Sequence, residues 1–146
     1  MPDAATLLAD IEALLDDVEA AAAAAEAARK PDDDIMQKLA ATGVFTAYVP
    51  KRFGGMELDY ETFVRIGMRL GEACTSTAWV TTFCMEHNWL LAHFPEQAQD
   101  DVYGKDPNTM ISAVIGPRGK AVLKADGTYV LNGFWPFGSG CQLSKW

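Results

Sequence analysis

Several features that define whole classes of protein are missing from this sequence. Lys and Arg number only 12 against 20 Asp and Glu, which gives a formal net charge of −8, and the basic residues form no cluster. Because nucleic acids and anionic membranes attract basic surfaces, we expect neither as a partner. The three cysteines are an odd number without a Cys-x-x-Cys pair. They predict reduced thiols and a cytoplasmic protein rather than a disulfide framework.

Long hydrophobic runs are also absent. The most apolar stretch, residues 78–94, is interrupted by a glutamate, an asparagine and two histidines. A membrane-spanning helix needs about 20 predominantly apolar residues in succession. This stretch therefore predicts a buried helix and no membrane partner.

Motifs for metal, hydrolytic or phosphate chemistry are not found either. His87 and His93 are six residues apart, a spacing that brings no second ligand to the same helix face, so we expect no metal site. No serine lies in a nucleophile elbow. The glycine-rich residues 116–120 match neither the P-loop nor the dinucleotide-binding pattern. They predict a turn that carries two solvated cations.

What the sequence does contain, up to residue 108, is a series of helical patterns. Apolar residues recur at three- and four-residue spacing, and aspartates, glycines and prolines mark where helices begin and end. The pattern after residue 77 is apolar on nearly all sides, which is typical of a central helix. Its tryptophans, Trp79 and Trp89, are expected in the core or in the wall of an aromatic pocket. The predicted helices are one over residues 3–30, one from Pro31 to a stop at Gly43, one capped by Asp59, one after residues 75–77 and one from Pro95 to Gly104, with an extended segment at 44–53 and a turn at Gly54-Gly55.

After residue 108 the pattern changes from helical to strand-like. Residues 110–115 predict a first strand, and residues 121–123 follow the glycine-rich turn. Asp126-Gly127 and Asn132-Gly133 are typical hairpin turns on either side of the strand-like residues 128–131. The sequence therefore predicts the beginning of an antiparallel sheet.

The order of these elements predicts the α+β class. We expect an N-terminal all-α domain over residues 1–108 and the beginning of an antiparallel β-domain over residues 109–146. A sheet of two or three strands is marginal by itself. We therefore expect this chain to be the front part of a longer polypeptide.

His87 is the first residue expected to carry chemistry. It lies in the middle of the most buried predicted helix, between Glu86 and Asn88. Such a histidine is either a core residue bonded to a backbone carbonyl or a proton-transfer group that faces a cavity, because imidazole titrates near neutral pH. The sequence alone leaves both alternatives open.

A second candidate site is an aromatic and glycine-rich segment near the end of the sequence. Trp135 and Phe137 predict an aromatic-rich strand that ends at small residues around Ser139. Flanking glycines such as Gly138 let a flat ligand approach the backbone, while hydroxyl and amide groups donate hydrogen bonds. The alternative is a strand that sends apolar side chains into the core. Ser112, in the apolar run of the first strand, needs a hydrogen-bond partner if buried and is on this ground expected to be structural.

The whole order of features resembles the acyl-CoA dehydrogenase superfamily. Residues 43–50 together with Gly54-Gly55 resemble its helix-to-loop signature, and the helices up to residue 108 match its N-terminal helical domain. Residues 126–135 resemble its central β-domain. The resemblance covers nearly the whole chain.

Two departures refine this resemblance. Acyl-CoA dehydrogenases usually carry Thr-Glu followed by Gly-Ser-Asp after the first β-strand, whereas residues 112–119 contain no acid. They usually have Trp-Ile-Thr-Asn or similar where residues 135–140 read Trp-Pro-Phe-Gly-Ser-Gly. That string is similar to the reduced-flavin-dependent, two-component aromatic monooxygenases of the p-hydroxyphenylacetate hydroxylase type.

The closer resemblance implies a mechanism used in aromatic catabolism. A separate flavin reductase supplies reduced FMN or FAD, molecular oxygen forms a hydroperoxyflavin, and the distal oxygen is transferred to a small aromatic or phenolic substrate. Catalytic roles fall to His87, which contacts the phenol, and to Ser139 beside the flavin ring. The residues implied to bind the flavin are Ser112, Trp135, Phe137, Gly138 and Ser139.

The same resemblance implies that a C-terminal helical bundle completes the flavin pocket and the contacts of a homotetramer. We therefore expect residues 1–146 alone to be inactive. One alternative is an acyl-CoA dehydrogenase that uses FAD, and another is a non-catalytic, truncated helical module that serves as an interaction partner.

Overall fold

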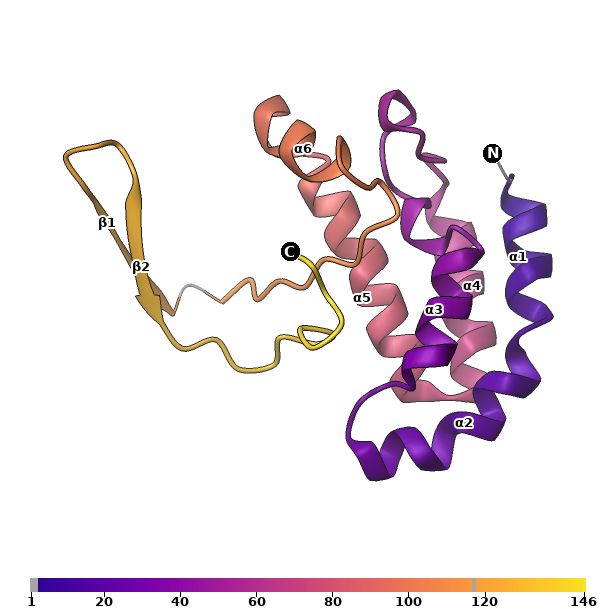
Figure 1. Cartoon of the computed structure of the whole chain (residues 1–146). Coiled ribbons are helices and arrows are strands. Elements are labelled where there is room, and N and C mark those ends of the chain that lie inside the picture. The colour runs from indigo at the N-terminus through magenta and orange to yellow at the C-terminus, as the bar shows by residue number, and fades with distance from the viewer. Residues whose placement is uncertain (1–2, 117) are drawn as a thin grey trace.

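The computed structural model describes residues 3–116 and 118–146, and it confirms the predicted α+β class. Helices form one body, and an antiparallel hairpin stands apart from them at the end of an extended arm (Figure 1). Pro117, inside the turn predicted at residues 116–120, lies outside the described residues. No helix among the residues that the structure describes is long and apolar enough to cross a membrane.

The first helical segment differs from its prediction. Instead of one helix over residues 3–30, α1 (Ala4–Glu12) and α2 (Leu15–Ala28) meet at a sharp bend (Figure 1). At the bend the N–H of Leu14 donates to the carbonyl of Ile11 at 3.0 Å, a tighter bond than the α-helical one. The bend lets α1 pack along α4 while α2 turns across α3, α4 and α5. A single straight helix would bury only one of these two faces.

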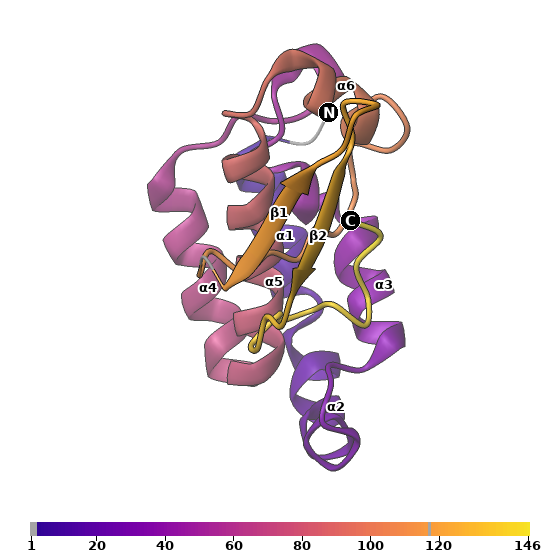
Figure 2. The same ribbon diagram turned by 90° about the vertical axis from the view of Figure 1, so that its left-hand side faces the viewer.

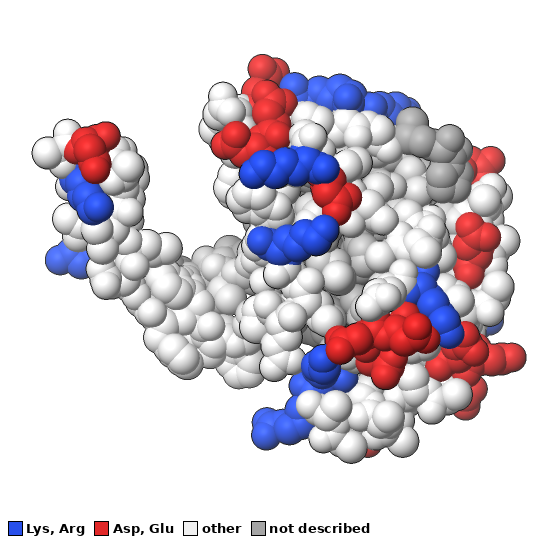
Figure 3. Space-filling model, in the orientation of Figure 1, with Lys and Arg blue, Asp and Glu red and all other residues white. Residues whose placement is uncertain are grey.

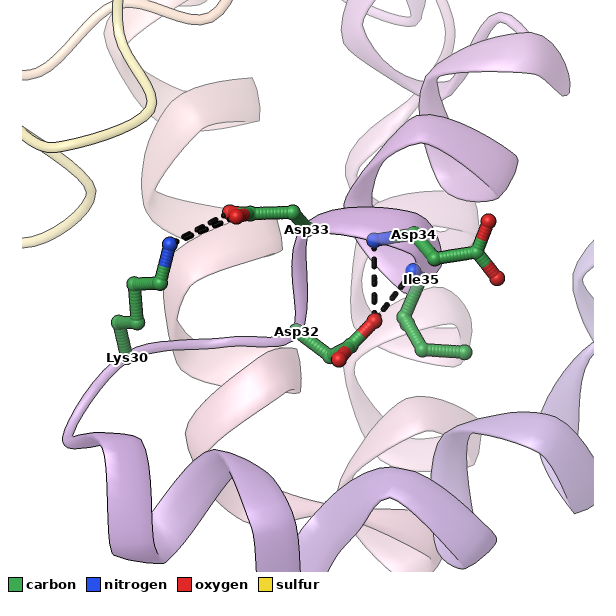
Figure 4. Close-up of polar contacts among 5 residues, drawn as sticks. All are labelled: Lys30, Asp32, Asp33, Asp34 and Ile35. Atoms are coloured by element: carbon green, nitrogen blue, oxygen red, sulfur yellow. Dashed lines mark hydrogen bonds and ion pairs between the residues drawn. The ribbon is translucent and has the colours of Figure 1, made fainter.

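Helix α3 (Asp33–Ala41) begins and ends where the sequence predicts. The Oδ1 atom of Asp32 accepts hydrogen bonds from the backbone N–H groups of Asp34 at 2.9 Å and Ile35 at 3.1 Å (Figure 4). These bonds satisfy two of the donors that a helix start leaves free. Gly43, with φ of 82°, ends the segment. This left-handed conformation costs glycine little.

Residues 44–53 are not extended as predicted, because they form two 3-10 turns, η1 (Val44–Thr46) and η2 (Lys51–Phe53). A segment without a neighbouring strand must satisfy its backbone locally, and i to i+3 bonds do so. The predicted turn at Gly54-Gly55 is confirmed by the φ of 86° at Gly54.

The centre of the helical body is the antiparallel pair α4 (Tyr60–Ala73) and α5 (Thr75–Leu91). Asp59 caps α4 as predicted, since its Oδ1 accepts from the N–H of Thr62 at 2.7 Å. Helix α5 begins at Thr75 itself rather than after residue 77. The expectation of core positions for Trp79 and Trp89 is wrong, because they are 54% and 49% exposed. Their large rings lie in the walls of surface hollows instead.

Helix α6 (Glu96–Tyr103) lies between Pro95 and Gly104, as predicted. It closes a small second core beside the larger one formed by α1 to α5. In this second core the hydroxyl of Tyr103 donates to the backbone carbonyl of Asn88 at 2.5 Å. The members of this second core are Val49, Leu91, Val102, Tyr103 and Ile111.

The arm after residue 108 holds a single hairpin of β1 (Gly119–Leu123) and β2 (Tyr129–Gly133), joined by the predicted turn at Asp126-Gly127. The predicted turn at Asn132-Gly133 is wrong, because both residues pair with β1. Every residue of both strands is exposed. The hairpin stands apart from the helices in Figure 1 and lies in front of them when the molecule is turned by 90° (Figure 2). Most of its visible surface is uncharged (Figure 3).

Residues 110–115, predicted as a strand, form none in the structure. They run in irregular conformation along α5, and their backbone meets the last residues of the chain. The N–H of Ser112 donates to the carbonyl of Trp146 at 3.0 Å, and the N–H of Lys145 donates to that of Met110 at 3.2 Å. An apolar run alone cannot make a strand without a neighbour to pair with.

Candidate functional site

Two segments of the arm, within residues 112–115 and 135–143, line three neighbouring hollows; residues of α5 share the walls of two of them, whereas the third is lined by the arm alone. Gly140 lets residues 135–143 pack closely against α5. A Cβ atom added there would lie 3.2 Å from Val80 and 3.3 Å from the Sγ atom of Cys84, and φ is +80°. Only glycine combines this conformation with so close an approach. The hollows are therefore fixed to the most rigid part of the fold.

His87 lines the smallest hollow, of about 230 Å³, and is itself 3% exposed. Its Nδ1 atom lies 3.0 Å from the carbonyl oxygen of Ile111. Because a carbonyl can only accept, Nδ1 carries the hydrogen in this bond, and Nε2 of the neutral ring keeps a free lone pair. The first alternative left by the sequence, a histidine bonded to a backbone carbonyl, is confirmed. The ring also lines a hollow, but its role in proton transfer stays a prediction.

An aromatic row on α5 links this hollow to the next. The ring of Phe83 meets that of His87 edge-on at 5.4 Å and stacks on that of Trp79 at 4.5 Å. The indole N–H of Trp79 donates to the Oγ atom of Ser139 at 3.1 Å. Trp79 was missed as a site residue, although the spacing of four between residues 79, 83 and 87 places all three on one helix face.

Ser139 lines the second hollow, of about 600 Å³, together with Trp79, Gly138 and the end of α2. Its Oγ atom accepts the indole hydrogen bond, so its own hydroxyl hydrogen stays available for a ligand. The serine follows Phe137, whose φ of 63° is a strained value for a residue with a side chain. The predicted aromatic strand here is wrong, because residues 134–138 form no strand and residues 139–143 form a turn.

Ser112, Trp135 and Gly138 share the third hollow, of about 370 Å³. The hydroxyl of Ser112 makes no hydrogen bond among the described residues, while its backbone N–H is bonded to Trp146. The indole of Trp135 lies across the base of the hairpin, where a Cβ at Gly119 or Gly133 would collide with it. This explains why glycine stands at position 133 without forming a turn.

Phe137 lines the hollow of His87 rather than that of Ser112, and it is 91% exposed. The predicted residues therefore gather around α5 in three neighbouring groups: His87 with Phe137, Ser112 with Trp135 and Gly138, and Ser139 with Gly138. Their roles stay predictions.

The chemistry of these groups suits a flat aromatic ligand with polar edges. Aromatic rings supply walls, the hydroxyls of Ser112 and Ser139 can donate, and His87 can accept. The buried thiol of Cys84 is not a competing nucleophile, because burial raises its pKa to about 11. A flavin ring fits this donor set, since its edge carries acceptors and its faces are apolar.

Comparisons with known proteins show which family the chain resembles. Residues 3–105 match the family model described as acyl-CoA dehydrogenase, N-terminal domain. The flavin-dependent monooxygenase oxygenase subunit HsaA of Mycobacterium tuberculosis is 39% identical over 144 residues, which cover 99% of this chain and 36% of HsaA. The p-hydroxyphenylacetate 3-hydroxylase oxygenase component of Acinetobacter baumannii is 32% identical over 141 residues, which cover 97% of this chain and 33% of that protein.

The three-dimensional comparison gives the same answer. The crystal structure of the HsaA monooxygenase from M. tuberculosis superimposes with a TM-score of 0.92 at 38% identity, covering 98% of this chain and 39% of that chain. The chain thus spans about a third of the length of the curated relatives it matches. With 103 residues matched from position 3 to position 105, the chain belongs to the acyl-CoA dehydrogenase family through its N-terminal domain.

Proposed function

We propose that this chain contributes to the oxygenase component of a flavin-dependent monooxygenase that hydroxylates an aromatic or phenolic substrate with molecular oxygen. Reduced FMN or FAD comes from a separate reductase. The observation that carries the proposal is the position of His87, which lines a hollow together with Phe83 and Phe137 and whose Nδ1 atom lies 3.0 Å from the carbonyl oxygen of Ile111. Relatives named as a flavin-dependent monooxygenase and as a p-hydroxyphenylacetate hydroxylase support it.

His87 acts on the substrate as a hydrogen-bond acceptor and base. The bond from Nδ1 to Ile111 fixes the ring in one tautomer and one orientation. The hydroxyl of a phenol bound in the hollow donates a hydrogen bond to Nε2. As the hydroxyl proton moves toward this nitrogen, the aromatic ring of the phenol becomes more electron-rich. Burial of His87 keeps water from competing for this bond.

The arm holds the flavin in this proposal. When bound, the reduced flavin supplies the electrons that activate oxygen for transfer to the aromatic ring. Ser139 and Ser112 donate hydrogen bonds to the polar edge of the flavin, and the indole of Trp79 orients the hydroxyl of Ser139. Gly138 lines both the hollow of Ser139 and the hollow of Ser112, and because glycine has no side chain it does not fill the space between them. Trp135 and Phe137 shield the reacting atoms from water.

We place this activity in a longer polypeptide that forms a homotetramer and whose further residues close the three hollows. Residues 1–108 are its helical domain, and the cytoplasm is its compartment. The three free cysteines suit a reducing compartment.

The proposal is tested with His87→Asn in the complete oxygenase. Removal of a catalytic base is expected to lower product formation about a hundredfold or more, while oxidation of the reduced flavin continues and releases hydrogen peroxide. His93→Asn, which changes a histidine two turns away on the surface, serves as the control and keeps full activity. Unchanged hydroxylation in His87→Asn removes His87 from the mechanism. Bleaching of oxidised flavin by an acyl-CoA, without hydroxylation of any phenol, overturns the whole proposal.

A further inference from the structure

A separate aromatic groove lies on the helical body, between residues 48–63 and the last turns of α5. Its volume is about 700 Å³, and no serine, glycine or other residue of the arm contributes to it. Only Glu86 lines both this groove and the hollow of His87. The full lining is Tyr48, Pro50, Glu57, Leu58, Tyr60, Phe63, Glu86, Trp89, Ala92 and His93.

Aromatic rings form half of the lining of the groove when His93 is included. Phe63 lies between two tyrosines, with ring centroids 5.6 Å from Tyr48 and 5.6 Å from Tyr60. On the opposite wall, Trp89 meets the edge of His93 at 4.6 Å. Tyr60 and Trp89 are 71% and 49% exposed. Their faces are thus held open to solvent, and aromatic faces carry the negative end of the ring quadrupole.

The charged groups of the groove are carboxylates, and the lining contains no Lys or Arg. Glu57 is already engaged, because its carboxylate accepts from the backbone N–H of Lys51 at 2.7 Å and lies 3.7 Å from the ammonium group of the same residue. Glu86 is different: within residues 3–116 and 118–146 its carboxylate has no ion-pair partner within 4.0 Å. The groove therefore offers one uncompensated negative charge.

The negative electrostatic potential of the groove affects the pKa of Tyr48. Burial raises the pKa of its hydroxyl to about 12, and Tyr60, Asp59 and Glu86 add to the rise. Negative groups that oppose the formation of a phenolate favour a cation in the same space. Glu57, whose carboxylate also lines the groove, has a backbone φ of 49°. This value is strained for a residue other than glycine.

We propose that this groove binds a small organic cation, a quaternary or tertiary ammonium group, with the exposed rings of Tyr60 and Trp89 beside the charge and Glu86 as its counter-ion. Aromatic cages recognise quaternary ammonium groups in this way. The carboxylates of Glu57 and Glu86 repel anions, and a neutral apolar ligand would leave the charge of Glu86 without a counter-ion. The proposal does not depend on flavin chemistry, so it can hold or fail independently of the proposed monooxygenase activity.

The test titrates this chain with choline and follows the indole N–H signals by heteronuclear NMR. A saturable shift is expected at Trp89, in the groove, and none at Trp79, whose indole is bonded to Ser139 outside it. The uncharged carbon isostere of choline, dimethylbutanol, has the same shape and is expected to give no saturable shift at the same concentrations. An equal response to both probes, or no saturable response to choline, overturns the proposal.

Glu86→Gln sharpens the test, because it removes the charge and keeps the shape. Choline affinity is expected to fall about fivefold, as one ion pair near water is lost. Glu19→Gln, an equal change of charge at an exposed site on α2, is expected to leave the affinity unchanged. Both side chains are exposed, so both variants fold, which the dispersion of the NMR spectra verifies. An unchanged affinity in Glu86→Gln contradicts the assigned counter-ion and the proposal with it.

Discussion

The helical body and the arm of this molecule differ in how much of their apolar surface is buried. Helices α1 to α5 pack a continuous core in which Leu7, Leu39 and Phe45 are 0% exposed. All ten residues of β1 and β2, by contrast, are exposed. A helix satisfies its backbone alone and needs only one covered face, whereas a hairpin needs further strands or a covering layer. Stability therefore resides in the helices, whereas the arm, which contributes little to stability, carries all of the predicted site residues except His87.

The sharpest test of this comparison is one large-to-small substitution in each region. Phe45→Ala removes a fully buried ring from the core and is expected to lower the free energy of unfolding by about 4 kcal/mol. Leu131→Ala, at a residue of β2 that is 62% exposed, is expected to change it by less than about 0.5 kcal/mol. Urea unfolding followed by far-UV circular dichroism measures both. Similar losses in the two variants show that the arm is integrated into the core.

The same contrast explains which elements the sequence predicts well. Local chemistry decides where helices begin and end, so the helix start after Pro31, the cap at Asp59 and the stops at Gly43 and Gly104 are predicted correctly. The bend between α1 and α2 is missed because nothing local enforces it; it follows from how two faces of one segment pack on α3, α4 and α5. Residues 110–115 are wrongly predicted as a strand for a related reason: an apolar pattern is local, but a strand also needs a neighbour, and among the described residues this segment pairs with no strand.

The cysteines give a second comparison between body and arm, in reactivity. Burial raises the pKa of Cys84, on α5, from 9.0 to about 11, whereas Cys141 in the arm is exposed. Near pH 8 iodoacetamide is expected to modify Cys141 about a hundredfold faster, because the thiolate is the reacting species. Peptide mass spectrometry over a time course gives both rates. Equal rates mean that the packing of Gly140 on Cys84 opens easily.

The raised pKa of Cys84 also predicts the dependence of stability on pH. In the unfolded chain the thiol ionises near its ordinary value of 9.0, while in the folded chain it keeps its proton up to about 11. The stabilising contribution is therefore fully present below pH 9 and is lost as the pH rises toward 11. Cys84→Ala removes this part of the alkaline loss, and an unchanged alkaline profile in that variant contradicts the assignment.

The sequence predicts candidate site residues, whose roles stay predictions, but it does not predict how they are grouped in space. His87, Ser112 and Ser139 are recognised from motifs, yet the sequence places them on a helix and two strands. The structure places both serines on irregular segments that α5 supports, through the close contact at Gly140 and the bond from Trp79. Such contacts join residues about 60 positions apart. No local pattern reports them.

The smallest expected effect concerns the joint between the two regions. Asn88, fully buried on α5, donates through Nδ2 to the carbonyls of Cys84 and Thr109, both at 3.0 Å. Thr109 begins the arm, two residues before Ile111, the acceptor for His87. Asn88→Ala leaves the buried carbonyl of Thr109 without its donor and is expected to cost about 2 kcal/mol. Gln97→Ala, which removes an exposed amide bonded to Asp101, is expected to cost almost nothing.

Hydrogen exchange separates a local from a general effect of Asn88→Ala. If Asn88 is the joint, the amide of Ser112 exchanges faster by more than the loss of global stability accounts for, because the arm loosens before the helices unfold. Amides within α4 then change only with global stability. A uniform acceleration across α4 and the arm shows instead that the two regions unfold as one unit. In that case the difference in burial between body and arm does not divide the molecule into independently opening parts, and His87 keeps its orientation for as long as the whole fold persists.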